Sequence, residues 1–206
     1  MNIRNTFPVI LLAVGILFVG CSSDPASGTD NPSNTTVNVK VMKDVKISAQ
    51  ASTISGNLYD VEKDSAYRMN FYSTKKTEID FIYYYGSGNG DNAAIVSPDY
   101  EVLSNGSIAG NYSGYATPSA RVGANVTQFK KLAGFTVAQF DAVNDSAAIA
   151  TAYTGGGTAD NKASNLIVGD VVAFRTANGT DGLFKVTDFF TQNAAGYVTI
   201  TIKTRK

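Results

Sequence analysis

Short segments in which apolar and polar residues alternate with a period of two recur along this chain. The first covers residues 37–41, and residues 45–49 continue it after a break at Lys43 and Asp44. A third, shorter segment covers residues 57–61. Because successive side chains of a strand face opposite sides, this alternation predicts half-buried β-strands.

Residues 79–85 are rich in β-branched and aromatic side chains and end at the glycine-rich turn 86–90. Phe81 and Tyr83 would face one side of this strand, and Ile82 and Tyr84 the other. Both faces therefore carry apolar bulk, which predicts a central position in a sheet.

The C-terminal part of the chain predicts a β-meander with strands at residues 171–177, 182–190 and 197–204. Asn178 to Gly182 supply the short glycine-containing loop that a hairpin requires. In the last strand, alternation places one set of side chains in the core and the other in solvent. The expected core residues are Val198, Ile200 and Ile202, and the expected solvent residues are Thr199, Thr201 and Lys203.

Two short helices are predicted before the meander. Thr136 and Gln139 match a capping box, and Phe140 and Val143 then share a face with Val137. Residues 145–153 form the second, with Asp145 as N-cap and glycines 155–157 as its end. Residues 70–77 are either a short helix capped by Asn70 or an irregular segment, because Tyr67, Met69 and Phe71 alternate as in a strand.

Strands, a helical insert and further strands favour an α+β, mainly β fold. The expected architecture is an antiparallel, sandwich-like domain over residues 37–206, with a C-terminal meander and one or two short helices. Residues 87–130 are rich in Gly, Ser and Asn and poor in pattern, so we expect a long loop where ligand contacts are concentrated.

The N-terminus adds a leader to this picture. Residues 7–20 are apolar and follow Arg4, but at about 1.5 Å per residue they span roughly 21 Å, short of a ~30 Å hydrocarbon core. A signal peptide over residues 1–20 is therefore predicted. Residues 18–21 resemble a lipobox with the acceptor Cys21, the only cysteine in the chain, although Phe18 replaces the usual Leu. The alternative is an ordinary secretory signal with an incidental cysteine.

Residues 22–36 contain no large apolar side chain, so residues 21–36 are predicted to be a flexible tether. The lipobox resemblance implies acyl chains on Cys21, and more than one chain gives stable membrane anchoring. By analogy with lipoprotein sorting, Ser22 after the cysteine favours the outer membrane. The sequence does not indicate whether the protein is on the cell surface or on the periplasmic face.

Composition excludes several kinds of chemistry. The chain has no histidine, which removes the commonest general base and metal ligand and rules out Ser-His-Asp and Cys-His sites. Lys and Arg total 17 and so do Asp and Glu, so no basic field attracts nucleic acid. Carboxylate pairs for glycoside chemistry stay open, but the acids are scattered. We expect no enzyme activity, no cofactor and no resident metal.

Three segments, 169–186, 79–86 and 136–141, together resemble a large set of uncharacterised Bacteroidetes surface lipoproteins. The resemblance covers about half of the mature chain and implies fold and location rather than a ligand. It is distantly similar to the HmuY-like haem-binding lipoproteins, whose iron is held by His or Met. Without His, and with Met42 and Met69 as the mature chain's methionines, haem is not expected.

Candidate ligand-binding residues are tyrosines, which offer rigid contact area and a hydroxyl for glycans or protein partners. They are Tyr84, Tyr100, Tyr112 and Tyr115, and the alternative is that such rings fill a core. Asn89, Asp91 and Asn92 offer oxygen ligands without the EF-hand pattern, so a flexible turn is expected there. Ser65 and Ser146 lie in Asp-Ser-Ala tripeptides similar to a Bacteroidetes O-glycosylation signal, which also arises by chance.

Taken together, these patterns predict a lipid-anchored, non-enzymatic envelope protein that binds an extracellular glycan or a protein partner. The rival hypothesis is a structural or adhesive component related to fimbriae. That rival needs a donor strand, for which residues 37–41 are the candidate.

Overall fold

The computed structural model describes residues 39–86, 92–101, 112, 117–190 and 192–205. These residues contain two antiparallel five-stranded sheets with a few short helices, which confirms the mainly β, sandwich-like fold predicted from the sequence. They belong to one compact unit, Thr36–Lys206. The candidate signal peptide and tether, Cys21 included, lie outside the described residues.

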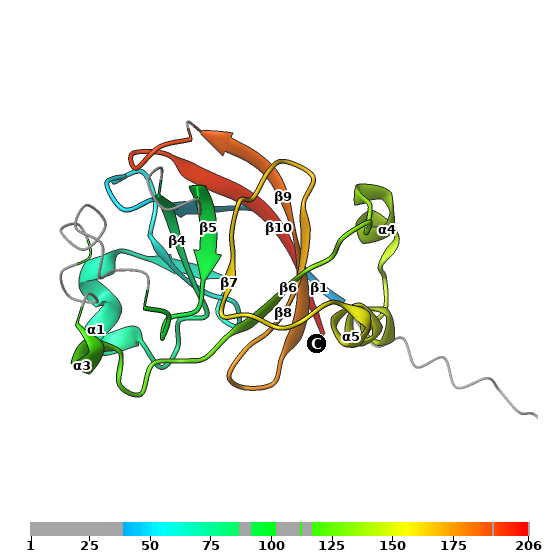
Figure 1. The fold of residues 1–206 in the computed structure, drawn as a ribbon, viewed down its shortest axis with the longest axis horizontal. Coiled ribbons are helices and arrows are strands. Elements are labelled where there is room, and N and C mark those ends of the chain that lie inside the picture. The colour runs from blue at the N-terminus through cyan, green and yellow to red at the C-terminus, as the bar shows by residue number, and fades with distance from the viewer. Residues whose placement is uncertain (1–38, 87–91, 102–111, 113–116, 191, 206) are drawn as a thin grey trace, which may run out of the picture. The chain divides into compact units, whose positions relative to one another are not determined.

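The larger sheet, sheet A, contains the predicted meander (Figure 1). Its strands run in the order β1 (Val39–Ser48), β10 (Tyr197–Arg205), β9 (Asp181–Phe190), β8 (Val171–Arg175) and β6 (Gln128–Lys131). The break expected near Lys43 and Asp44 is a β-bulge: the register of β1 against β10 shifts between Met42 and Val45, and Asp44 has a left-handed φ of 56°. β1 is thus one bent strand rather than two.

Sheet B has β4 (Phe81–Gly86) at its centre, as its two apolar faces predict. The order is β3 (Ser65–Tyr67), β2 (Leu58–Asp60), β4, β5 (Asn92–Val96) and β7 (Lys162–Ala163). β5 lies within the segment 87–130 that was expected to be a long loop, and β6 begins within it, so that expectation is wrong for these residues. Each is five residues or shorter, and the surrounding Gly, Ser and Asn residues obscure its pattern.

The main core lies between the two sheets and is rich in phenylalanine. The ring of Phe81 from β4 meets that of Phe174 from β8 edge-on, with centroids 4.9 Å apart. Phe174 also lies over Gly182 of β9, where a Cβ atom added to the glycine would come within 2.2 Å of the ring. Such aromatic contacts add specific geometry to the burial of apolar area, and they tie sheet A to sheet B.

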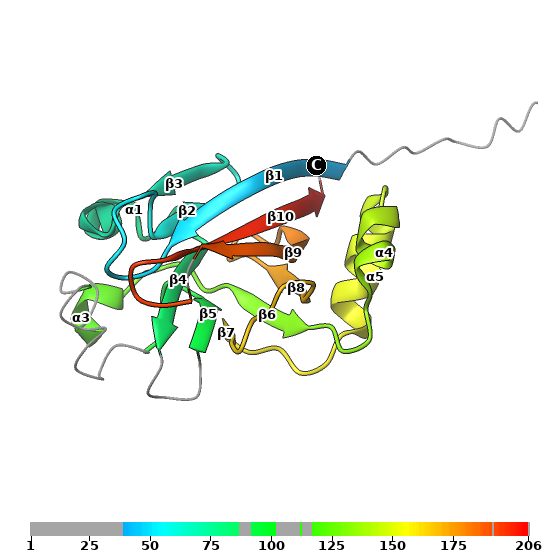
Figure 2. The same cartoon turned by 90° about the horizontal axis from the view of Figure 1, so that it is seen from above.

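The two predicted helices exist and cover the outer face of sheet A (Figure 2). α4 (Val137–Ala142) begins with the capping box of Thr136 and Gln139, and α5 (Ser146–Gly155) begins with Asp145 accepting a hydrogen bond from the Ala148 amide. Their apolar side chains pack on Val171, Ala173 and Leu183 of β8 and β9. Phe140 and Val143 are buried there as predicted, but Val137 is exposed.

The expectation that Thr199 and Lys203 face solvent is wrong, and α4 is what covers Lys203. Both are buried, and Thr201 is half-buried. The Lys203 ammonium donates hydrogen bonds to the carbonyl oxygens of Phe140, Asp141 and Val143 at 2.8, 3.0 and 2.7 Å. These carbonyls end α4, so Lys203 works as its C-terminal cap.

The outer face of sheet B packs on η1 (Met69–Phe71) and α1 (Tyr72–Lys75). A short helix is therefore present within 70–77, but Asn70 lies inside the 3-10 turn and caps nothing. Another short helix, α3 (Pro118–Arg121), begins with Thr117 as cap. Both outer faces are therefore covered over part of their area.

Candidate functional site: a polar cleft beside the β2–β3 hairpin

A cleft of about 500 Å³ opens beside the turn that joins β2 to β3. It lies where the end of β10 and the β8–β9 turn approach that hairpin. Polar side chains dominate its lining. The lining residues are Lys40, Asp60, Val61, Glu62, Lys63, Thr77, Glu78, Asp80, Thr176, Asn178, Thr180, Thr204 and Arg205.

Two buried carboxyl groups form the deepest polar part of this cleft. Asp80 is 4% exposed and Asp60 is 2% exposed. One Asp80 oxygen accepts a hydrogen bond from the Val61 amide at 2.9 Å, and one Asp60 oxygen accepts from the Lys63 amide at 3.0 Å. Each carboxyl group thus satisfies a backbone donor of the hairpin turn, which explains why both tolerate burial.

Burial raises the pKa of the Asp80 carboxyl from 3.8 to about 7. The nearby negative charges of Asp60 and Glu62 push it in the same direction, and the hydrogen bond from the Val61 amide opposes the shift only in part. Asp80 is therefore divided between its acid and its carboxylate near neutral pH. It offers the cleft either a hydrogen-bond donor or an acceptor.

Lysine and arginine side chains surround these acids. Lys63 forms an ion pair with Glu78 and lies 3.7 Å from an Asp60 oxygen. Lys40 from β1 donates to the carbonyl oxygens of Glu62 at 2.9 Å and Val61 at 3.4 Å. The lining thus holds both signs of charge, together with hydroxyl and amide groups.

The predicted tyrosines lie elsewhere. Tyr84 is 1% exposed and Tyr112 is 0% exposed, and the Tyr112 hydroxyl donates to the Tyr83 carbonyl oxygen at 2.7 Å. Tyr100 packs, half-buried, against the same cluster on the outer face of sheet B. Tyr115 lies outside the described residues. The described tyrosines of this set therefore meet in a core cluster. This is the alternative stated in the sequence analysis, in which such rings fill a core.

The other candidates from the sequence are scattered. Ser65 is half-buried in β3, and Ser146 is buried at the start of α5. Asn92 donates a hydrogen bond to the side chain of Asn165 at 3.1 Å, whereas Asn89 and Asp91 lie outside the described residues. Within the described part of the chain, no group of three or more Asp, Glu, His or Cys side chains is placed to hold a metal ion.

Sequence reasoning missed the cleft because its residues come from five separate strands and turns. The one local signal was the run of charges from Asp60 to Asp64, which follows a short strand. Residues 178–182 were recognised as a hairpin loop, but nothing in the sequence places that loop opposite Asp80.

Comparisons with known proteins add a fold likeness. No family model matches the chain, and no curated protein matches it. Among solved structures, it is similar to a DUF4466 family protein from Parabacteroides merdae, with 16% sequence identity and a TM-score of 0.49. The alignment covers 82% of this chain and 54% of that one, so the chain spans about half the length of its neighbour.

The likeness concerns the fold and not lipid attachment or haem. In the described part of the chain, no helix combines the length and the apolar composition that crossing a membrane requires.

Proposed function

We propose that this chain is a lipid-anchored envelope protein that binds a glycan in the cleft beside the β2–β3 hairpin. The anchor is the acylated Cys21, and residues 22–36 are the tether that holds the domain away from the headgroups. The observation that carries the binding role is the lining of the cleft, in which carboxyl, ammonium, amide and hydroxyl groups converge on about 500 Å³.

The chemistry of this lining favours a hydroxyl-rich ligand over a protein partner. Protein interfaces are centred on aromatic and apolar anchors, and charged side chains are depleted there. The cleft presents instead Thr77, Thr176, Thr180 and Asn178 beside its charged groups, and its described lining contains no aromatic ring. Hydroxyl and amide side chains of this kind pair with the hydroxyl groups of a sugar chain.

The same geometry favours binding over catalysis. A glycoside hydrolase needs one carboxyl group as acid and a second as nucleophile or base. Asp80 has the raised pKa of a general acid, but Asp80 and Asp60 both accept hydrogen bonds from the hairpin backbone. Each of these hydrogen bonds satisfies a backbone donor of the turn, which gives both carboxyl groups a structural role.

The fold supports the fimbria-related alternative less well than it supports glycan binding. A donor strand completes the sheet of another subunit. The described part of the candidate strand, from Val39 onward, pairs with β10 of its own sheet over the length of β1. A glycan-binding role requires no rearrangement of this pairing.

A glycan array tests the binding role, using the full-length protein purified in a mild detergent. The informative variant is Asn178→Trp, which places a large side chain in the cleft from the exposed β8–β9 turn. We expect wild-type protein to bind a defined group of glycans and the variant to lose at least tenfold in affinity. Asn144→Trp, in the exposed link between α4 and α5, is the matched control and keeps wild-type binding.

Silence across the array would remove the glycan hypothesis, and equal glycan binding by both tryptophan variants would remove the cleft as the binding site. Recovery of one envelope protein in a parallel pull-down would replace it with a protein partner. The anchor is tested separately by mass spectrometry of the N-terminal peptide. Fatty acid on Cys21 is the expected result, and a free thiol on a secreted protein contradicts it.

A further inference from the structure

Beyond the β8–β9 turn, a second hollow continues from the cleft. This groove, of about 410 Å³, is lined by residues 124–126, Gln128, Arg175, Thr176 and Ala177. Thr176 lines both the groove and the cleft, so the two hollows adjoin at this residue. We call the second hollow the Arg175 groove.

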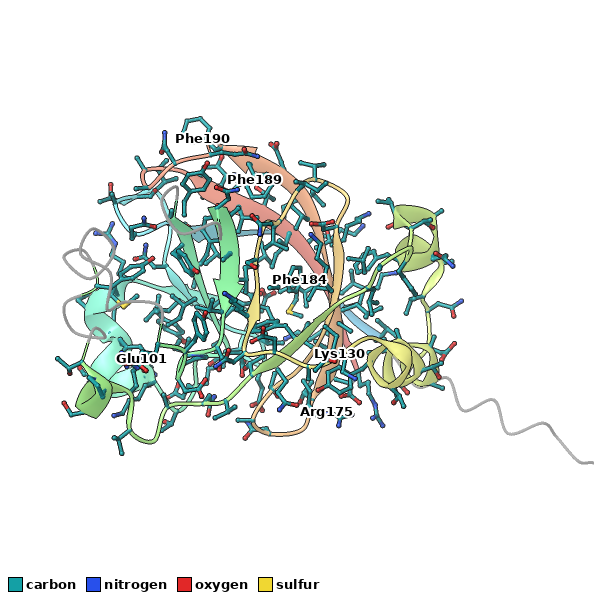
Figure 3. The ribbon with its side chains drawn as sticks, in the orientation of Figure 1. Glu101, Lys130, Arg175, Phe184, Phe189 and Phe190 are labelled. Carbon is teal, nitrogen blue, oxygen red and sulfur yellow. The ribbon has the colours of Figure 1, made fainter. Side chains whose placement is uncertain are left out.

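One cation, Arg175, lines the groove, and a second, Lys130, lies outside the lining but close to it in β6. In the β6–β8 pair, Gln128 lies opposite Arg175, and Lys130 lies two residues further along β6 on the same face. The ring of Tyr153 from α5 packs against both cations, with the Arg175 guanidinium carbon 4.3 Å and the Lys130 ammonium 4.6 Å from its centre. Figure 3 shows Lys130 and Arg175 close together next to α5.

Each cation is held in place by its neighbours. Arg175 makes two hydrogen bonds to Asp181, at 2.6 and 3.1 Å, and the Tyr153 hydroxyl donates to the Gln128 side chain at 3.0 Å. The stem of Lys130 packs so closely on Gly156 that an added Cβ there would lie 3.1 Å from it. Cations fixed by cation–π contacts and packing lose little conformational entropy when they bind an anion.

Positive charge in this region exceeds negative charge. Arg175 and Arg205 share the single buried carboxylate of Asp181, with Arg205 3.4 Å from it on the cleft side. The Lys130 ammonium forms no hydrogen bond or ion pair with any residue in the described part of the chain. Three cations near the groove, Arg175, Arg205 and Lys130, therefore face one carboxylate, and Lys130 has no carboxylate partner among these residues.

From this arrangement we infer that the Arg175 groove is a subsite for a carboxylate group carried by the glycan, so that the ligand is an acidic glycan. This inference rests on the proposed glycan-binding function. The distances to the common ring centre place the two cationic groups at most about 9 Å apart, so one anionic sugar reaches both. Arginine and lysine are the usual donors to such a carboxylate.

The adjoining cleft limits how much charge the ligand carries. Asp60, Glu62, Glu78 and Asp80 line it, and these acids would repel a chain with an anion on every unit. A polyglutamate-like peptide therefore fits poorly. A glycan with isolated acidic sugars fits both hollows, with its neutral hydroxyl groups in the cleft and a carboxylate at the groove.

Matched pairs of oligosaccharides test the inference on full-length protein in detergent. Each pair consists of an oligosaccharide with one uronic acid and the same molecule after reduction of that carboxylate to an alcohol. We expect about tenfold tighter binding of the acidic member in 50 mM salt, with the difference shrinking at high salt. Lys130→Gln should remove most of this difference and leave binding of the reduced member unchanged.

Lys131→Gln is the control, because it removes the same charge from the neighbouring position of β6, where Lys131 pairs with Asp170 at 2.7 Å. It should keep the full preference for the acidic member. Equal binding of both members in every pair overturns the acidic-glycan inference while leaving glycan binding in the cleft intact. An equal loss in both lysine variants, or stronger binding of polyglutamate than of any glycan, also overturns it. Absence of binding to every glycan contradicts the proposed function itself.

Discussion

Two buried charged side chains, one under the helices on sheet A and one in the open cleft, show how differently the fold treats a charge. Lys203 is 8% exposed and donates to three carbonyl oxygens at the end of α4. Asp80 is 4% exposed and accepts a hydrogen bond from one backbone amide, beside two other acids. The number and sign of the surrounding partners differ, although the burial is similar.

This difference separates a structural contact from a responsive one. Burial and the nearby Lys185 and Lys43 lower the pKa of Lys203, Asp141 opposes this shift, and the side chain is committed to three carbonyl oxygens as a helix cap. Burial and like charges raise the pKa of Asp80 to about 7, so its charge changes within the physiological range. Responsive chemistry is therefore concentrated in the cleft, and the helix-covered face is built for stability.

The largest effect should come from removing the Lys203 cap. Lys203→Met keeps an apolar stem but removes the ammonium that donates to three carbonyl oxygens at the end of α4, of which only the Phe140 oxygen keeps a second donor among the described residues, the Val143 amide. Unsatisfied buried groups cost about 1–3 kcal/mol each, with partial relaxation, so we expect a loss of about 2–4 kcal/mol in the free energy of unfolding. Urea denaturation measures it, with the exposed Lys43→Met as the control.

The variant at Lys43 should stay within about 0.5 kcal/mol of wild type. If Lys203→Met is equally mild, the three hydrogen bonds do not hold α4 on the sheet. Lys203 would then no longer stand as the structural counterpart of Asp80.

Asp80 should behave in the opposite way, because its burial costs stability once the group ionises. Below pH 3.8 the carboxyl is protonated in both states. As pH rises from about 4 to 7, the unfolded chain releases the proton while the folded chain retains it, so stability falls through this window and the cost stays constant above pH 7. The shift corresponds to an upper limit of about 4 kcal/mol.

Asp80→Asn keeps an acceptor for the Val61 amide and removes the charge. We therefore expect it to stabilise the fold by about 1–3 kcal/mol at pH 8 and to have little effect at pH 4. Denaturation curves at the two pH values decide the matter. If the change in stability is the same at both pH values, the buried charge of Asp80 is not what destabilises the folded state.

The same contrast explains what the sequence predicted and what it did not. Period-two patterns predicted β1 and β10 because each strand buries an apolar face, whereas apolar bulk on both faces predicted β4 as a central strand. They also assigned Lys203 to solvent, since the residues that cover it, Phe140 to Val143, lie about 60 positions earlier in the chain. A strand pattern reports that its two faces differ. It does not report that a distant helix covers the second face.

The candidate site was less predictable than the fold for a related reason. The charges of Asp60 to Asp64 are visible in the sequence, but their meaning depends on Arg205 and the β8–β9 turn, which reach them only after both sheets have formed. Tyrosines were chosen for their chemistry, and Tyr84 and Tyr112 proved to be core residues because both faces of sheet B are covered. Local pattern predicts elements, whereas a cleft is a property of their packing.

A smaller effect is expected at the start of α4, the helix whose other end Lys203 caps. Thr136→Ala removes the hydroxyl that accepts a hydrogen bond from the Gln139 amide. The loss of an N-cap typically costs about 1 kcal/mol. Combining Thr136→Ala with Lys203→Met should give a non-additive loss if both act by holding the same helix, measured as a double-mutant cycle.

The smallest effect should come from Lys63, the exposed cation at the mouth of the cleft. Its ion pair with Glu78 is open to water and its contact with the buried Asp60 is long, at 3.7 Å, so both contribute little to stability. Lys63→Gln should therefore change the midpoint of urea unfolding hardly at all. It should still alter binding of the glycan in the cleft, because it changes the charge that a ligand meets there. If Lys63→Gln keeps wild-type stability but changes binding, the charges at the cleft serve ligand binding. If it lowers stability and leaves binding unchanged, the cleft is a structural region like that around Lys203.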